Sequence, residues 1–80
     1  MNNNEKYKKS FVESLDVEEK LINEKLKYND IPEWDSIGHM TLIASLEETF
    51  NITLETDDII DFSSVKKGIE ILKKYSINFN

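Results

Sequence analysis

The sequence of 80 residues contains no cysteine and no arginine, and only two glycines and one proline. Without cysteine there is neither a disulfide framework nor a thiolate metal site. No apolar run approaches the roughly 18 residues that a helix needs to cross a bilayer. The first residues, MNNNEKYKKS, lack the apolar core of a signal peptide. These absences favour a cytoplasmic protein that does not insert into a membrane.

A chain of this length predicts a single domain over residues 1–80. Such a chain buries only about 60–65% of its unfolded surface, so its core must be compact. We expect the ordered core to cover about residues 4–75, with the Asn-rich start and the final SINFN frayed. We also expect a monomer.

The charge is distributed unevenly along the chain. All ten basic residues are lysines, and none of them lies between Tyr28 and Val65. That segment contains nine acidic residues: Asp30, Glu33, Asp35, Glu47, Glu48, Glu55, Asp57, Asp58 and Asp61. A field of one sign repels nucleic acid and attracts basic proteins. A solvated acidic surface with no partner explains the same pattern.

The spacing of apolar residues predicts an all-α protein. Tyr7, Phe11 and Leu15 recur every fourth residue, which indicates a helix over about residues 4–15. Residues 16–29 predict a long loop with some helix in it. Three further helices are expected, at about 35–50, 56–61 and 63–75. The sequence therefore predicts a small four-helix bundle with a long loop after the first helix and a short third helix.

Hydroxyl residues stand where the later helices should begin. Thr56 is the predicted N-cap of the short helix, and Ser63 or Ser64 that of the last one. The last helix should bury three apolar residues, Val65, Ile69 and Leu72.

The second helix has two apolar stripes when its residues are placed at 100° intervals. One stripe should face the core: Leu42, Ile43, Leu46 and Phe50. The other contains Ile37, Met40 and Ala44, and it lies roughly opposite Leu42. An exposed apolar stripe with an acidic rim is typical of a helix that docks onto a partner. Alternatively, the loop or the short third helix covers this stripe.

Ser36 stands at or next to the first position of the second helix. A helix N-terminus carries about half a positive charge, so a phosphate attached to Ser36 would be stabilised by the dipole and by free amides. Gly38 would leave room beside it. A simple capping role for Ser36 or Asp35 explains the same position.

The segment DSIGHMTLIASLEETFNITL resembles the acyl carrier protein family, whose hallmark is Asp-Ser-Leu at the start of the second helix. The resemblance spans roughly residues 11–75, including the acidic ETDDIIDF. It implies that a phosphopantetheinyl transferase uses coenzyme A to attach 4′-phosphopantetheine to Ser36, which Asp35 and Ile37 flank. Ile37 replaces the usual leucine. Gly38 and His39 replace a more polar pair, which suggests a stand-alone carrier of a specialised biosynthetic pathway.

The resemblance also implies how partners dock. Ile37, Met40 and Ala44 would supply the apolar contact. The acidic residues that would steer basic partners are Glu47, Glu48, Asp57, Asp58 and Asp61. The implied partners are the transferase, an acyl- or aminoacyl-loading enzyme, and an acyltransferase or synthase with a basic docking surface.

Two other functions fit the same residues. An adaptor of the same fold would leave Ser36 unmodified. A hydrolase would use Asp35, Ser36 and His39, but no feature suggests an oxyanion hole. A lone histidine is a poor indicator of a metal site, and DDIIDF lacks the pattern of a calcium loop, so neither catalytic residues nor metal ligands are predicted.

The core offers two alternatives for the cargo. The helices could part to shelter an acyl chain among Leu46, Phe50, Ile59, Phe62 and Ile69. Alternatively, these residues form an ordinary packed core.

Overall fold

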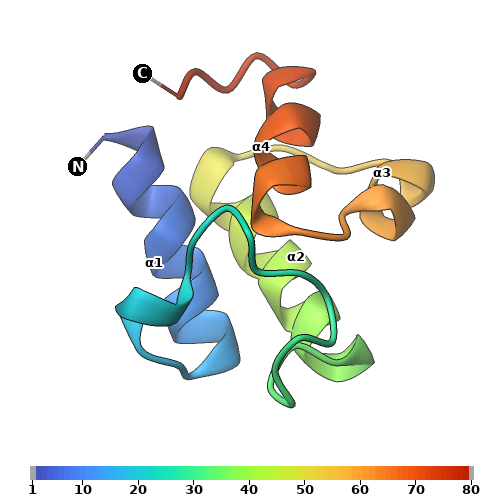
Figure 1. Cartoon of the computed structure of the whole chain (residues 1–80). Helices are drawn as coiled ribbons and strands as arrows, with labels where there is room; N and C mark the ends of the chain where they lie inside the picture. The colour runs from blue at the N-terminus through green and yellow to red at the C-terminus, as the bar shows by residue number, and fades with distance from the viewer. Residues whose placement is uncertain (1, 80) are drawn as a thin grey trace.

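The computed structural model describes residues 2–79, in which helices are joined by loops. Figure 1 shows the order of the elements along the chain. They are α1 (Asn3–Leu15), the 3-10 turn η1 (Glu19–Leu21), α2 (Ser36–Phe50), α3 (Thr56–Asp61) and α4 (Val65–Lys73). Residues 2–79 contain no strand beyond an isolated bridge between Lys27 and Ser64. The predicted all-α class, long loop and short third helix are confirmed.

Helix α1 packs against α2 along the face that its sequence predicts. Asn2 caps α1 by accepting a hydrogen bond of 2.8 Å from Glu5 N. Tyr7, Phe11 and Leu15 are all buried. Apolar burial on this face therefore joins the two longest helices.

The long loop after α1 is fixed to the rest of the protein by both apolar and backbone contacts. Ile22, Leu26 and Trp34 are buried in the core. Val65 N donates to Leu26 O at 3.0 Å, and Tyr28 N donates to Ser63 O at 2.9 Å. The loop thus lies against the junction between α3 and α4.

Helix α4 closes the bundle over Tyr7. Ser64 caps it, accepting from Lys67 N at 2.9 Å. The Tyr7 hydroxyl donates to Val65 O at 2.6 Å, and burial raises the pKa of this phenol, which keeps it a donor. Of the predicted core residues of α4, Val65 and Leu72 are buried, but Ile69 is only half-buried, and Ile71 is buried instead.

The structure corrects one predicted cap. Glu55, not Thr56, is the N-cap of α3, and Thr56 is its first helical residue. The Glu55 side chain makes no capping hydrogen bond. The Glu55 N–H group instead donates to the Tyr75 hydroxyl at 3.0 Å, so contact with the end of α4 takes over the function of a cap.

The last described residues lie against the core rather than away from it. Ile77 and Phe79 are half-buried beside it. The Phe79 ring stands 5.4 Å from that of Tyr7 and 6.3 Å from that of Phe50, between centroids. Figure 1 shows this tail passing above the start of α1. No helix within residues 2–79 is long and apolar enough to span a membrane.

We expect Gly68→Ala to destabilise the fold, because a Cβ there would lie 2.2 Å from both Phe62 Cζ and the Tyr7 hydroxyl. Both rings are buried, so they cannot move aside freely. Overpacking of this kind costs about 1–3 kcal/mol. Urea unfolding measures the loss. Lys66→Ala, at an exposed position of the same helix, should change stability by no more than about 0.5 kcal/mol. Equal stability of both variants would show that the Gly68 contact can relax.

Candidate functional site

The candidate site begins between the buried Trp34 and the exposed first residue of α2, Ser36. The Trp34 side chain is completely buried, and its ring meets that of Phe11 edge to face at 5.3 Å. Asp35 is the N-cap residue of α2, and its Oδ1 accepts a hydrogen bond of 2.8 Å from Gly38 N. Ser36 is the first helical residue and is exposed. The capping role therefore belongs to Asp35, and Ser36 is left for another use.

The Ser36 hydroxyl is open to an incoming group. Among residues 2–79 it makes no hydrogen bond, and the backbone N–H groups of Ser36 and Ile37 have no acceptor. Unpaired amides at a helix N-terminus attract anions, and the helix dipole adds to this attraction. The residues present therefore fit a phosphate ester attached to Ser36.

Gly38 serves a different purpose from the predicted one. A Cβ at Gly38 would lie 2.2 Å from the carbonyl oxygen of Glu33 and 3.1 Å from Leu15 Cδ2. The expectation that Gly38 leaves space beside Ser36 for a phosphate is thus wrong. Its small size lets the loop before α2 pass close over the first turn of the helix.

A cavity of about 280 Å³ lies beside Ser36, and we call it the Ser36 cavity. Its walls come from the loop, from α2, and from α3 with the residues that follow it. They are mostly apolar: Tyr28, Ser36, His39, Met40, Ile59, Ile60, Phe62 and Ser63. Two of the predicted acyl-chain residues, Ile59 and Phe62, are among them. Leu46 is fully buried in the core and does not line this cavity.

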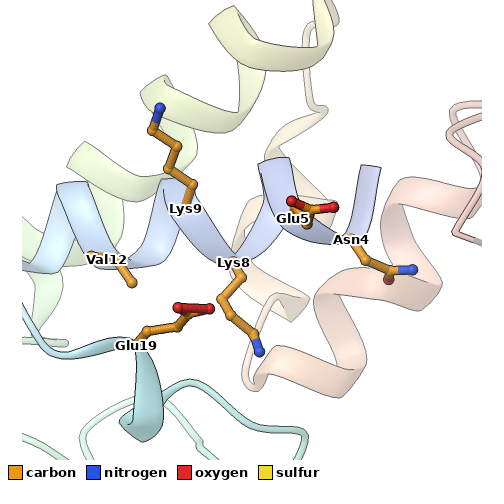
Figure 2. Close-up of a pocket in the computed structure, with 6 residues that line it drawn as sticks. All are labelled: Asn4, Glu5, Lys8, Lys9, Val12 and Glu19. Atoms are coloured by element: carbon orange, nitrogen blue, oxygen red, sulfur yellow. The ribbon is translucent and has the colours of Figure 1, made fainter. Parts of the chain in front are cut away.

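A second hollow, of about 370 Å³, lies on the surface of α1 beside η1. Figure 2 shows its lining, which comes from one face of α1 and from Glu19. Its side chains are mainly charged and polar: Asn4, Glu5, Lys8, Lys9, Val12 and Glu19. It contains none of the residues around Ser36, so it is not part of the candidate site.

His39 is a connecting residue inside the site. The Trp34 indole donates from Nε1 to His39 Nδ1 at 3.0 Å. The other ring nitrogen, Nε2, lies 2.9 Å from the carbonyl oxygen of Ile59 in α3. Neither nitrogen is available to take a proton from Ser36, so the hydrolase arrangement does not form.

The second stripe of α2 is exposed as predicted. The exposed fractions are 77% for Ile37 and 55% for Met40, and Ala44 is also exposed. The opposite stripe is buried at Leu42, Ile43 and Leu46, whereas Phe50 is half-buried. Ile60 of α3, which the sequence did not single out, is 73% exposed. Neither the loop nor α3 covers the stripe.

The predicted acidic residues do not all face solvent. Glu48, Asp57 and Asp61 are exposed. Glu47 is half-buried, and its Oε2 accepts a hydrogen bond of 2.8 Å from Leu54 N. Asp58 is only 5% exposed, so the expectation that it presents a charge to partners is wrong.

Asp58 instead fastens α3 to the end of α4. Its two carboxylate oxygens accept hydrogen bonds of 2.5 Å each, one from Lys74 Nζ and one from the Tyr75 hydroxyl. These hydrogen bonds, first that from Lys74, hold the pKa of Asp58 below its usual value. The partner group responds in the opposite direction, and the pKa of Lys74 is raised. Two hydrogen bonds donated to a buried carboxylate favour its ionised form.

No group of three or more His, Cys, Asp or Glu side chains that could hold a metal ion occurs in residues 2–79.

The fold and the site together define a phosphopantetheine attachment domain, a small helical domain that presents a serine hydroxyl at the start of its second helix. A family model described as the phosphopantetheine attachment site matches residues 34–71, which begin at Trp34 and include Ser36. The acyl carrier protein of Buchnera aphidicola subsp. Baizongia pistaciae (strain Bp) is 35% identical over 71 residues, covering 88% of this chain and 90% of that protein. The acyl carrier protein of the subspecies Acyrthosiphon pisum (strain Tuc7) is 31% identical over 74 residues, covering 91% of each chain.

The chain belongs to the acyl carrier protein family. Members of this family are carriers rather than enzymes, and their prosthetic group is a covalently attached 4′-phosphopantetheine. They interact with modifying enzymes and with enzymes that handle acyl groups.

We expect Asp58→Asn to lower stability most at neutral pH. Because the folded-state pKa of Asp58 is depressed, its contribution is present above the unfolded carboxyl pKa of about 3.9 and disappears as the pH falls through the folded value. Urea midpoints of wild type and variant should therefore converge at acidic pH. Asp57→Asn, at the exposed neighbouring position, is the control and should follow wild type. A gap between Asp58→Asn and wild type that does not change with pH would contradict this assignment.

Proposed function

We propose that Ser36 is the attachment point of 4′-phosphopantetheine. The observation that carries this proposal is the exposed Ser36 hydroxyl at the first position of α2, with two unpaired amides beside it and Asp35 occupied as the cap. The bond would form between Ser36 Oγ and the phosphorus of coenzyme A that carries the pantetheine. The pyrophosphate P–O bond would break, which releases the adenosine bisphosphate part, and the hydroxyl proton would also be released. When attached, the group supplies a thiol that holds an acyl group as a thioester.

Each neighbour of Ser36 has a distinct part in this proposal. Asp35 holds the first turn of α2 in place through Gly38 N. The amides of Ser36 and Ile37 face the phosphodiester. The apolar Ser36 cavity gives the arm or its cargo a place to rest against Met40 and Ile59.

We further propose a docking surface for the partner enzymes. It consists of the exposed stripe of α2 with Ile60, rimmed by three exposed acids: Glu48, Asp57 and Asp61. Ile60 belongs with the stripe because it and Met40 line the same cavity. Surfaces of this kind suit short encounters, since charge steers the approach and a small apolar contact releases easily.

The partners that fit this surface are a phosphopantetheinyl transferase, an acyl- or aminoacyl-loading enzyme, and an acyltransferase or synthase with a basic docking surface. The Gly38–His39 pair, which replaces the more polar pair common in the family, supports a specialised pathway, and we place the carrier there, as a monomer in the cytoplasm.

Incubation with coenzyme A and a broad-specificity phosphopantetheinyl transferase tests the attachment. Intact-protein mass spectrometry should show the gain of one phosphopantetheinyl group on the wild type and none on Ser36→Ala. Ser63→Ala is the matched control, because Ser63 is exposed and lines the same cavity. Loss of modification in Ser63→Ala alone would place the group on Ser63 instead of Ser36, and no gain of mass in the wild type would favour an unmodified adaptor.

Charge reversal tests the docking surface. Glu48→Lys and Asp61→Lys should each slow loading by the cognate enzyme several-fold at low salt and much less at high salt, because screening removes the steering field. Glu47 is left unchanged, since its carboxylate holds Leu54 N.

Glu13→Lys on α1 makes the same change of charge away from this surface, and its ion pair with Lys9 is exposed and long at 3.9 Å. It should load at nearly the wild-type rate. Equal slowing by all three variants would point to net charge rather than to a defined surface.

A further inference from the structure

The Ser36 cavity has an open mouth and a closed floor. Ser36, Met40 and Ile60 are exposed, so they lie at its mouth. Phe62 is 1% exposed and His39 is half-buried, so these two rings form its floor. The two rings meet edge to face, with 5.8 Å between their centroids. None of the buried leucines of α2 lines the cavity, which therefore ends at this pair of rings.

Hydrogen bonds keep this floor closed. The Trp34 indole donates to His39 Nδ1 at 3.0 Å, and His39 Nε2 lies 2.9 Å from the Ile59 carbonyl oxygen in α3. A chain that passed between α2 and α3 would have to separate His39 from Ile59 and leave their polar groups without partners. Further along the same face of α2, Leu42 and Leu46 are fully buried in the packed core. Entry beyond His39 is therefore opposed by hydrogen bonding and by packing.

The size and the polarity of the cavity restrict its occupant. A cavity of about 150 Å³ takes up one benzene molecule. On this scale, a cavity of about 280 Å³ holds roughly ten carbon atoms. The thioester end of an acyl group takes part of this space, which leaves room for about eight carbons at most. Among residues 2–79, no Asp, Glu or Lys side chain lines the cavity, so a charged group would lose hydration there without gaining an ion pair.

We propose that the cargo sheltered by the Ser36 cavity is an uncharged acyl group of at most about eight carbons, and that His39 is the residue that limits its length. This assignment rests on the proposed attachment of phosphopantetheine to Ser36. Because Ser36 itself lines the cavity, the flexible arm turns back on itself and brings its acyl end beside Met40 and Ile59. The excess of a longer chain stays in water. The loading enzyme that fits is then one that handles short apolar carboxylic acids rather than amino acids.

Loading with acyl groups of increasing length tests this proposal. A broad-specificity phosphopantetheinyl transferase attaches the acylated arm from butanoyl-, hexanoyl-, octanoyl-, dodecanoyl- or hexadecanoyl-coenzyme A, and coenzyme A alone gives the free-thiol reference. The methyl NMR signals of Met40 and Ile59 should shift from this reference increasingly up to octanoyl, and no further with the two longest groups. The methyl signals of Leu46 in the core should not move with any of them. An ω-aminohexanoyl group should leave all these signals at the reference, because no carboxylate among residues 2–79 lines the cavity to pair with its ammonium.

Two pairs of variants show what sets the limit. His39→Ala removes part of the floor, so the dodecanoyl and hexadecanoyl groups should now shift the Leu46 methyl signals. Thr41→Ala, at an exposed position of α2 outside the cavity, is its control and should behave as wild type. Ser63→Phe places a ring in the cavity and should abolish the shifts caused by hexanoyl and octanoyl, whereas Ser63→Ala should retain them. Because Ser63 is exposed, this second pair does not depend on whether His39→Ala folds.

Mass spectrometry of each sample separates failure of the attachment from failure of the cargo assignment. Wild type that gains no mass would contradict attachment to Ser36, and the cargo assignment with it. In wild type that has gained the mass, Leu46 signals that move with hexadecanoyl would overturn the cargo assignment alone. Signals of Met40 and Ile59 that do not depend on acyl length would do the same, because the cargo would then lie outside the cavity. Unmoved Leu46 signals in folded His39→Ala would overturn the role of His39.

Discussion

Burial of the Trp34 indole determines where α2 begins and what it presents. The ring packs against Phe11 in the core, and the chain reaches the surface at the next residue, the exposed Asp35. Asp35 turns the backbone and caps the helix, and Ser36 follows at the surface. The buried Trp34 and the capping Asp35 fix the backbone at Ser36, so the Ser36 hydroxyl needs no hydrogen bond to be positioned. Because Asp35 is the cap, Ser36 does not have to cap the helix, as serine often does at this position.

Helix α2 packs against the protein on one side only, and the short helix α3 leaves its other side uncovered. The buried stripe of α2 packs on α1, while Ile37 and Met40 remain exposed beside Ser36. A longer, apolar α3 would cover this side, gaining burial but closing the surface. The actual helix of six residues packs on the core through the half-buried Ile59 and is held further by the hydrogen bonds of Asp58 and His39. These contacts fix α3 in place without covering the exposed stripe. This arrangement keeps a cavity beside Ser36 in a chain too short to enclose one deeply.

The periodicity of the sequence predicts the helices and both stripes of α2, because burial repeats every three or four residues along an amphipathic helix. It does not predict which acids are free. Asp58 has the same local signature as Asp57 and Asp61, yet its partners lie 16 and 17 residues away. The bridge from His39 to Ile59 spans 20 residues. The role of Gly38 depends on the Glu33 carbonyl, which approaches through the path of the loop. Contacts of this kind follow from how the elements pack, so no local pattern encodes them.

Two of the predicted docking acids, Glu47 and Asp58, are bound internally, but only Asp58 is lost from the long-range field of the proposed docking surface. Asp58 and Lys74 together are neutral, so this pair adds little to the field at a distance. Glu47 keeps its charge while it binds Leu54 N, and at long range an ionised carboxylate attracts a basic partner whatever its hydrogen bonds. The long-range field is thus carried by Glu47, Glu48, Asp57 and Asp61, whereas close contact is available only to the exposed members. Steering and docking consequently depend on different sets of residues. Salt should weaken the electrostatic steering much more than the apolar contact through Ile37 and Met40.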